Sequence, residues 1–129
     1  MMDNSKLKEV VSDLRRYIGV RKVYLTEKAP EFVGVKDKRR NTFLLAAHLY
    51  EVGIDPRDLL YLLNTGRLPV DLEYKLRENF ELSELIRAYE MVKGYGVEEL
   101  RKKGYIPVKV KAKEFFEYLD DVVRSLLRR

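Results

Sequence analysis

The sequence predicts a mainly α protein: a single compact helical domain over residues 1–129, with six or seven helices and a small β element of two or three strands. Apolar residues recur at intervals of three and four along most of the chain, which is the periodicity of amphipathic helices. Alternation of apolar and polar residues is confined to short stretches within 20–36 and 106–111, which predicts the β element. The chain shows no internal repeat and no linker, and 129 residues suffice for one buried core.

Composition excludes several kinds of site. The chain is 46% hydrophobic and 36% charged, as globular proteins are. It has no cysteine and one histidine, which excludes disulfides, thiolate metal sites and multi-histidine sites, so we expect neither metal nor cofactor. No apolar run approaches the roughly 20 residues of a membrane span, and no signal peptide is recognisable, so we expect a cytoplasmic protein without membrane contact. Abundant Lys, Arg and Glu without Gln, Cys or Trp are typical of a thermophile.

Positive charge is concentrated in two segments. Residues 36–40 carry a net charge of +3 and residues 101–113 one of +6, so the rest of this +5 chain carries −4. Such a distribution favours an anionic partner. The alternative is that these are ordinary solvated surface cations.

The first third of the chain combines a helix with extended segments. Leu7, Val10, Leu14 and Ile18 fall on one face of a helix over residues 5–18. Residues 20–36 change to period two and are expected to form one or two strands, with Pro30 in the connection.

Residues 41–70 are expected to form two short helices joined by a tight turn. Asn41 is a suitable cap for a helix over 42–52 that Gly53 ends. Asp55 followed by Pro56 is a strong start signal for a second helix, which reaches about Asn64 before Gly66.

The remaining elements follow from the same rules. A helix is expected from residue 69 or 71 to 79, another over 84–93 with Ser83 as its cap, and a short one over 97–103. Residues 106–111 are expected to form a strand with a lysine face. A last helix, 113–128, has an apolar stripe wide enough either to be deeply packed or to be shared with a second subunit.

The turn between the two central helices carries a known pattern. Gly53, Asp55, the inward Leu59, Leu62 and Leu63, and then Gly66-Arg67-Leu68-Pro69 resemble the helix-turn-helix of excisionase-like and MerR-like DNA-binding domains over about residues 44–70. The resemblance implies that the helix over 56–64 approaches bases in a groove through Arg57, Tyr61 and Asn64, with Arg67 beyond it. An ordinary helical hairpin produces the same glycine spacing by capping alone.

The basic segments supply the expected phosphate contacts. Arg39 and Arg40 precede the central helix. Cations at the start of a helix are unfavourable for its dipole, so their presence there indicates an anion to be bound. Lys109 and Lys111 share one face of the predicted strand, and the nearby Tyr105 is suited to stacking on an unpaired base. The alternative for these lysines is protection of an edge strand against aggregation.

We therefore expect a nucleic-acid-binding protein, of DNA rather than RNA, with a regulatory or accessory role and no catalytic residues. The first alternative is a helical adaptor that forms a homodimer through residues 113–129. The second rests on Arg40, Asn41 and His48, which resemble the arginine-to-histidine motif of HEPN-type ribonucleases.

Overall fold

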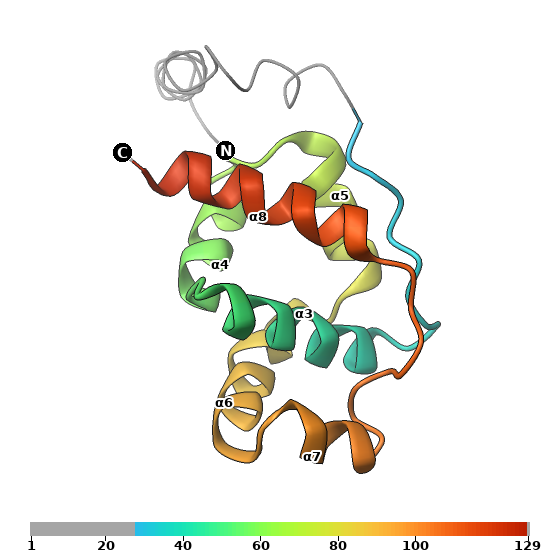
Figure 1. The fold of residues 1–129 in the computed structure, drawn as a ribbon. Coiled ribbons are helices and arrows are strands. Elements are labelled where there is room, and N and C mark those ends of the chain that lie inside the picture. Colours follow the sequence, from blue (N-terminus) through green and yellow to red (C-terminus); the bar gives the residue numbers. More distant parts are fainter. Residues whose placement is uncertain (1–27, 129) are drawn as a thin grey trace, which may run out of the picture.

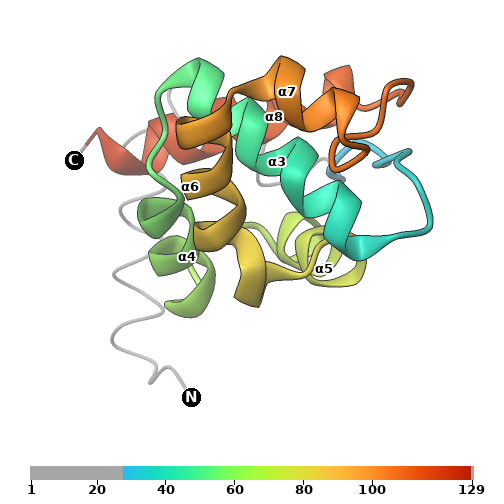
Figure 2. The ribbon, with the colours of Figure 1, turned by 90° about the horizontal axis from the view of Figure 1, so that it is seen from below.

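Helix α3 (Lys38–Val52) is central to the structure, a computed structural model that describes residues 28–128. Six α-helices, α3 to α8, and one 3-10 turn follow one another in these residues, in agreement with the predicted mainly α class. Helix α6 (Leu85–Tyr95) lies along α3, and α8 (Lys113–Leu127) crosses on the other side (Figures 1 and 2). The helix expected over residues 5–18 and the strand expected near residues 20–27 lie outside the described residues.

The start of α3 differs from the prediction. Asp37 caps the helix, because its carboxylate accepts from the main-chain N–H groups of Arg39 and Arg40 at 3.0 and 3.3 Å. Asn41 was therefore wrongly expected as the cap. It lies inside the helix, 2% exposed, and its side chain bonds to the main chain of Val35 and Asn79.

The α3–α4 connection forms as expected. Gly53 adopts the left-handed conformation, φ 75°, and ends α3. Helix α4 (Pro56–Asn64) begins behind Asp55, whose carboxylate accepts from the N–H of Arg57 at 2.8 Å, with proline in the first turn. The cap and the proline satisfy local rules, so sequence was enough to place them.

Helix α5 (Val70–Asn79) matches the expected helix, but the segment after it does not match in detail. Leu82–Glu84 form a 3-10 turn before α6, and Ser83 bonds to Glu81 instead of capping the helix. Helix α6 continues through Gly94, and Gly96, with φ 87°, separates it from α7 (Val97–Lys102).

The predicted strand over 106–111 is not formed. Among residues 28–128 the only β pairing is one isolated antiparallel bridge between Val33 and Lys111, and no strand is present. Pro107 has no N–H to donate to a ladder, and Val108 is 69% exposed, so neither residue behaves as part of a sheet. The segment is instead an irregular connection from α7 to α8 that passes the amino-terminal end of α3 (Figure 1).

The wide stripe of α8 is buried within the chain itself. Phe115 is fully buried, and its ring lies 5.2 Å from that of Phe32 and 6.1 Å from that of Phe80 between centroids. The stripe is part of one core to which all six helices contribute. The residues of α8 in this core are Phe115, Phe116, Tyr118, Leu119, Val122, Val123 and Leu126. Intramolecular packing therefore accounts for the width of the stripe. None of the helices in 28–128 has the length and apolarity needed to cross a bilayer.

Candidate functional site

A groove of about 220 Å³ opens where the first half of α3 faces α6 and the loop after α7. Helix α3 contributes Arg39, Arg40 and Phe43 to it, because positions 39, 40 and 43 share one face of a helix. Helix α6 contributes Glu84, just before its first residue, and Arg87, and Tyr105 closes the groove from the loop after α7. Three elements far apart in sequence thus build one site.

The cationic side of this groove has unused binding capacity. Arg39 and Arg40 form no ion pair within residues 28–128, whereas Arg87 lies 3.6 Å from the carboxylate of Glu84. The Nε of Arg40 is buried and has no hydrogen-bond partner in this part of the chain. A buried donor without a partner costs about 1–3 kcal/mol, so an acceptor that reached it would be bound favourably.

The other side of the groove is aromatic. The rings of Phe43 and Tyr105 lie 5.1 Å apart between centroids with a 42° tilt. Phe43 packs against the hydrophobic core, and Tyr105 is 42% exposed. The pair therefore offers a fixed ring surface that a planar ligand can reach.

The main-chain amides at the start of α3 are already occupied. The carboxylate of Asp37 takes the N–H groups of Arg39 and Arg40, so the expectation that a free helix terminus awaits an anion is wrong in this respect. The N–H groups of Arg39 and Arg40 are therefore not free to bind an anion at this end of α3.

The lysines predicted to bind phosphate lie beyond Tyr105 on the irregular connection. Lys109 and Lys111 are exposed and form no ion pair within residues 28–128. Much of the remaining charge of this segment is compensated locally by three ion pairs: Arg101–Glu98 at 2.5 Å, Lys103–Glu99 at 3.9 Å and Lys113–Glu117 at 3.9 Å. The effective charge of the segment is therefore smaller than the sequence suggests.

The residues predicted to read bases lie elsewhere. Leu59, Leu62 and Leu63 of α4 face the core, which leaves Arg57, Tyr61 and Asn64 exposed. Helix α4 follows the carboxyl end of α3, and 15 helical residues span about 22 Å, so these side chains lie at the opposite end of α3 from the groove (Figure 1). Arg67 is only partly exposed, and one of its terminal nitrogens is buried without a partner in the described part of the chain.

The structure thus divides the predicted site residues into two groups. Arg39 and Arg40 line the groove near the Lys109–Lys111 connection, and the α4 residues form a separate surface. Sequence reasoning missed Phe43 and Arg87. Phe43 belongs to an apolar run that looks like core, and Arg87 lies three residues after Glu84 like any surface pair on a helix.

The side chains of His48 and Asn41 are engaged in packing and hydrogen bonding within the fold. The ring of His48 stacks on Phe116 with centroids 4.6 Å apart, and burial lowers its pKa from the ordinary value, although the charges of Asp120 and Glu51 oppose that change. Both polar atoms of the Asn41 side chain are engaged by main-chain groups. Arg40 and His48 are eight residues apart on α3, about 12 Å along its axis, so they do not share one phosphate.

Within residues 28–128, no group of three or more His, Asp or Glu side chains is arranged to hold a metal ion. Comparison with protein-family models, with curated proteins and with solved structures found no match. The groove geometry and the surface of α4 are therefore the observations from which a function is inferred.

Proposed function

We propose that the protein binds nucleic acid as a regulatory or accessory factor and performs no chemistry of its own. The observation that supports this best is the groove beside α3, where Arg39 and Arg40 have no acidic partner among residues 28–128 and lie next to an exposed tyrosine ring. Arginine binds phosphate through its planar guanidinium, and phosphate contacts dominate the affinity of proteins for nucleic acid.

DNA is proposed ahead of RNA because of α4. A helix that reads a groove needs one face held by packing and an exposed polar face, and α4 has both. Arg57 and Asn64 are the side chains on that face with the hydrogen-bonding capacity to read base edges, whereas the exposed Asp58 repels phosphate.

A titration at several salt concentrations tests the proposal. Single- and double-stranded oligonucleotides of DNA and RNA are labelled, and binding is followed by fluorescence anisotropy. We expect the logarithm of the association constant to fall linearly with the logarithm of salt concentration, because bound cations release counterions from the phosphates. Absence of binding to all four ligands at low salt would overturn the proposal.

Charge removal at each end of α3 then locates the interface. Arg39→Ala and Arg40→Ala are each expected to lower the salt slope by about 1. Arg57→Ala removes the same charge at the other end of the helix and serves as the matched comparison. Because both surfaces belong to the proposal, the relative size of the two effects shows how the phosphate contacts divide between the groove and α4, and a larger effect at Arg57 than at Arg39 and Arg40 would place most of them at α4.

A further inference from the structure

We propose that the groove between α3, α6 and the loop after α7 holds one unpaired nucleotide, with its base against Tyr105 and Phe43 and its phosphate on Arg39 and Arg40. This groove then prefers an unpaired nucleotide to one inside a closed duplex, whereas α4, after the carboxyl end of α3, is the surface proposed for duplex DNA. This inference rests on the proposed function and adds the class of ligand that this groove binds.

The size of the groove suits part of a polymer. At about 220 Å³ and open to solvent, it is smaller than the roughly 300–1,000 Å³ of pockets that enclose a whole small-molecule ligand. A nucleotide within a strand needs only its ring and one phosphate inside the groove, and its neighbours continue along the surface. The exposed lysines at 109 and 111, on the connection that leads away from Tyr105, are suited to those neighbouring phosphates.

The charges of the groove are complementary to a phosphate. Three arginines and one glutamate line it, which gives a local charge of +2. The carboxylate of Glu84, the one acid that residues 28–128 contribute to the lining, is held 3.6 Å from Arg87 and is thus already paired. Within residues 28–128 the guanidinium groups of Arg39 and Arg40 form no ion pair, so both stay available to a phosphate.

The ring pair of Phe43 and Tyr105 favours a nucleotide over other anionic ligands. An acidic peptide would satisfy the arginines and leave the ring surface unused, whereas a nucleotide joins an anion to a planar ring. Bases stack on tyrosine and phenylalanine in single-strand-binding proteins with little dependence on sequence, because every base has a π face. Tyr105 is exposed enough to be reached, and Phe43, anchored in the core, fixes its position.

A closed duplex does not present this combination. Its base faces are covered by their stacked neighbours, so a base must leave the stack before it meets Tyr105, and extrusion costs free energy that an already unpaired base does not lose. The structure therefore favours strands with free bases.

The test compares one oligonucleotide in two forms at one salt concentration. A labelled single strand, the same strand in a blunt duplex, and the single strand with abasic residues are titrated with the full chain. We expect tighter binding of the intact single strand than of the abasic strand, and a smaller effect of Tyr105→Ala on the blunt duplex, which α4 can bind without the groove, than on the single strand. Tyr105→Ala is expected to weaken single-strand binding by about five- to 100-fold, and Tyr105→Phe, which keeps the ring, to bind like the parent.

The outcomes separate this inference from the proposed function. Equal affinity for single strand and duplex, with no effect of Tyr105→Ala, would overturn the nucleotide groove and leave salt-dependent nucleic-acid binding standing. Binding of no oligonucleotide at low salt would overturn both. Competition by polyglutamate as effective as that of the unlabelled single strand at equal charge would overturn the nucleotide assignment in favour of an acidic protein partner.

Discussion

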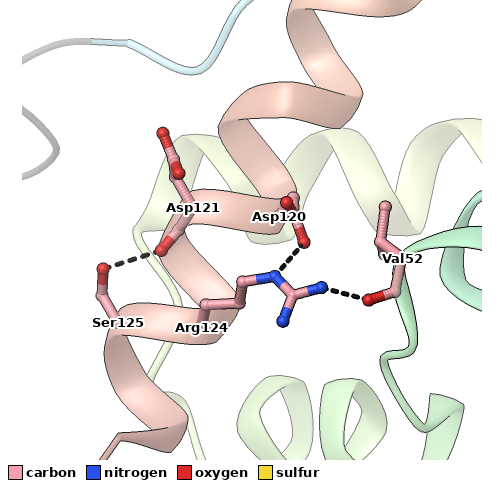
Figure 3. A network of polar contacts seen from close by, with 5 residues as sticks. All are labelled: Val52, Asp120, Asp121, Arg124 and Ser125. Atoms are coloured by element: carbon pink, nitrogen blue, oxygen red, sulfur yellow. Dashed lines mark hydrogen bonds and ion pairs between the residues drawn. The ribbon is translucent and has the colours of Figure 1, made fainter.

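The guanidinium of Arg124, on α8, donates a hydrogen bond to the main-chain oxygen of Val52, the last residue of α3 (Figure 3). The Nε of the same side chain donates to Asp120 at 2.8 Å, one turn earlier on α8. The N–H groups of Gly53 and Ile54 already satisfy two other carbonyls of the last turn of α3. Arg124 therefore satisfies a third carbonyl at the carboxyl end of α3 and links it to α8 immediately before the turn into α4.

Arg124→Met removes the hydrogen bonds to Val52 and Asp120 and keeps the aliphatic part of the side chain. A hydrogen bond to a charged group contributes about 1.5–3 kcal/mol, and a side chain that is 40% exposed recovers part of that from water, so we expect a loss of about 1–2 kcal/mol. Unfolding in guanidinium chloride measures this loss as a change in the free energy of unfolding. Arg77→Met, which breaks the exposed ion pair with Glu73 at 3.8 Å, is the matched control and should change stability by less than about 0.5 kcal/mol. Equal effects of the two substitutions would contradict a specific role for Arg124.

The buried amide of Asn41 is predicted to stabilise the fold. It links the segment before α3 to the end of α5 through three hydrogen bonds of 2.8 to 3.1 Å with the main chain of Val35 and Asn79. Asn41→Ala leaves those main-chain groups without their partner, so we expect a loss of about 2–4 kcal/mol in the free energy of unfolding. Thr42→Val removes one hydroxyl that accepts from the N–H of Glu81 at 2.8 Å, and about 1–2 kcal/mol is expected.

The Asn41→Ala variant also separates a structural role of Asn41 from the ribonuclease alternative. Loss of an RNA-cleaving activity in Asn41→Ala, with the free energy of unfolding unchanged, would show that Asn41 serves catalysis and not the fold.

Gly34 is predicted to be required for steric reasons. A Cβ built at this position meets the ring of Phe32 and the amide oxygen of Asn41, and both of those residues are buried. Gly34→Ala forces two packed side chains to move, so we expect a loss of at least about 1–3 kcal/mol. Gly94→Ala is the control, since nothing lies within 4 Å of its built Cβ in α6, and alanine favours helix by about 0.5–1 kcal/mol. A destabilised Gly94→Ala together with an unchanged Gly34→Ala would reverse this assignment.

Local signals in the sequence predicted local structure correctly. Asp55 and Pro56 placed the start of α4 because a cap and a first-turn proline need no distant partner. Asn41 misled because asparagine has the chemistry of a cap, while its actual partner, the carbonyl of Asn79, is 38 residues away. Asp37, the true cap, lies among four cations in residues 36–40, so the basic character of that segment hides its capping role.

Features that depend on a distant partner were not predictable in the same way. The alternation of Ile106, Val108 and Val110 implied a strand, but a strand needs a neighbour along its length, and the described part of the chain supplies only the pairing of Lys111 with Val33. The groove arises because α3 and α6 pack side by side (Figure 2), and that packing brings Arg87 beside Arg39 and Arg40. No spacing within either helix encodes it.

His48 is predicted to make the stability of the protein depend on pH near neutrality. Burial lowers its pKa below the ordinary value of 6.5, so the folded protein keeps the ring neutral while the unfolded chain takes up a proton as the pH falls below about 6.5. The contribution of the neutral ring is complete above pH 6.5 and is lost as the pH falls toward the folded-state pKa. We expect the free energy of unfolding of the parent to decrease between pH 7 and 5.5 more steeply than that of His48→Gln.

The chain has one histidine, so its imidazole resonances in an NMR titration belong to His48 without assignment. A midpoint below 6.5 is expected in the folded protein. Asp120→Asn removes a charge that raises this pKa and should move the midpoint lower still, whereas Arg124→Met removes a charge that lowers it and should move the midpoint up. A folded-state midpoint at or above 6.5 would contradict burial as the dominant influence on His48, because attraction by Asp120 and Glu51 would then outweigh the loss of hydration.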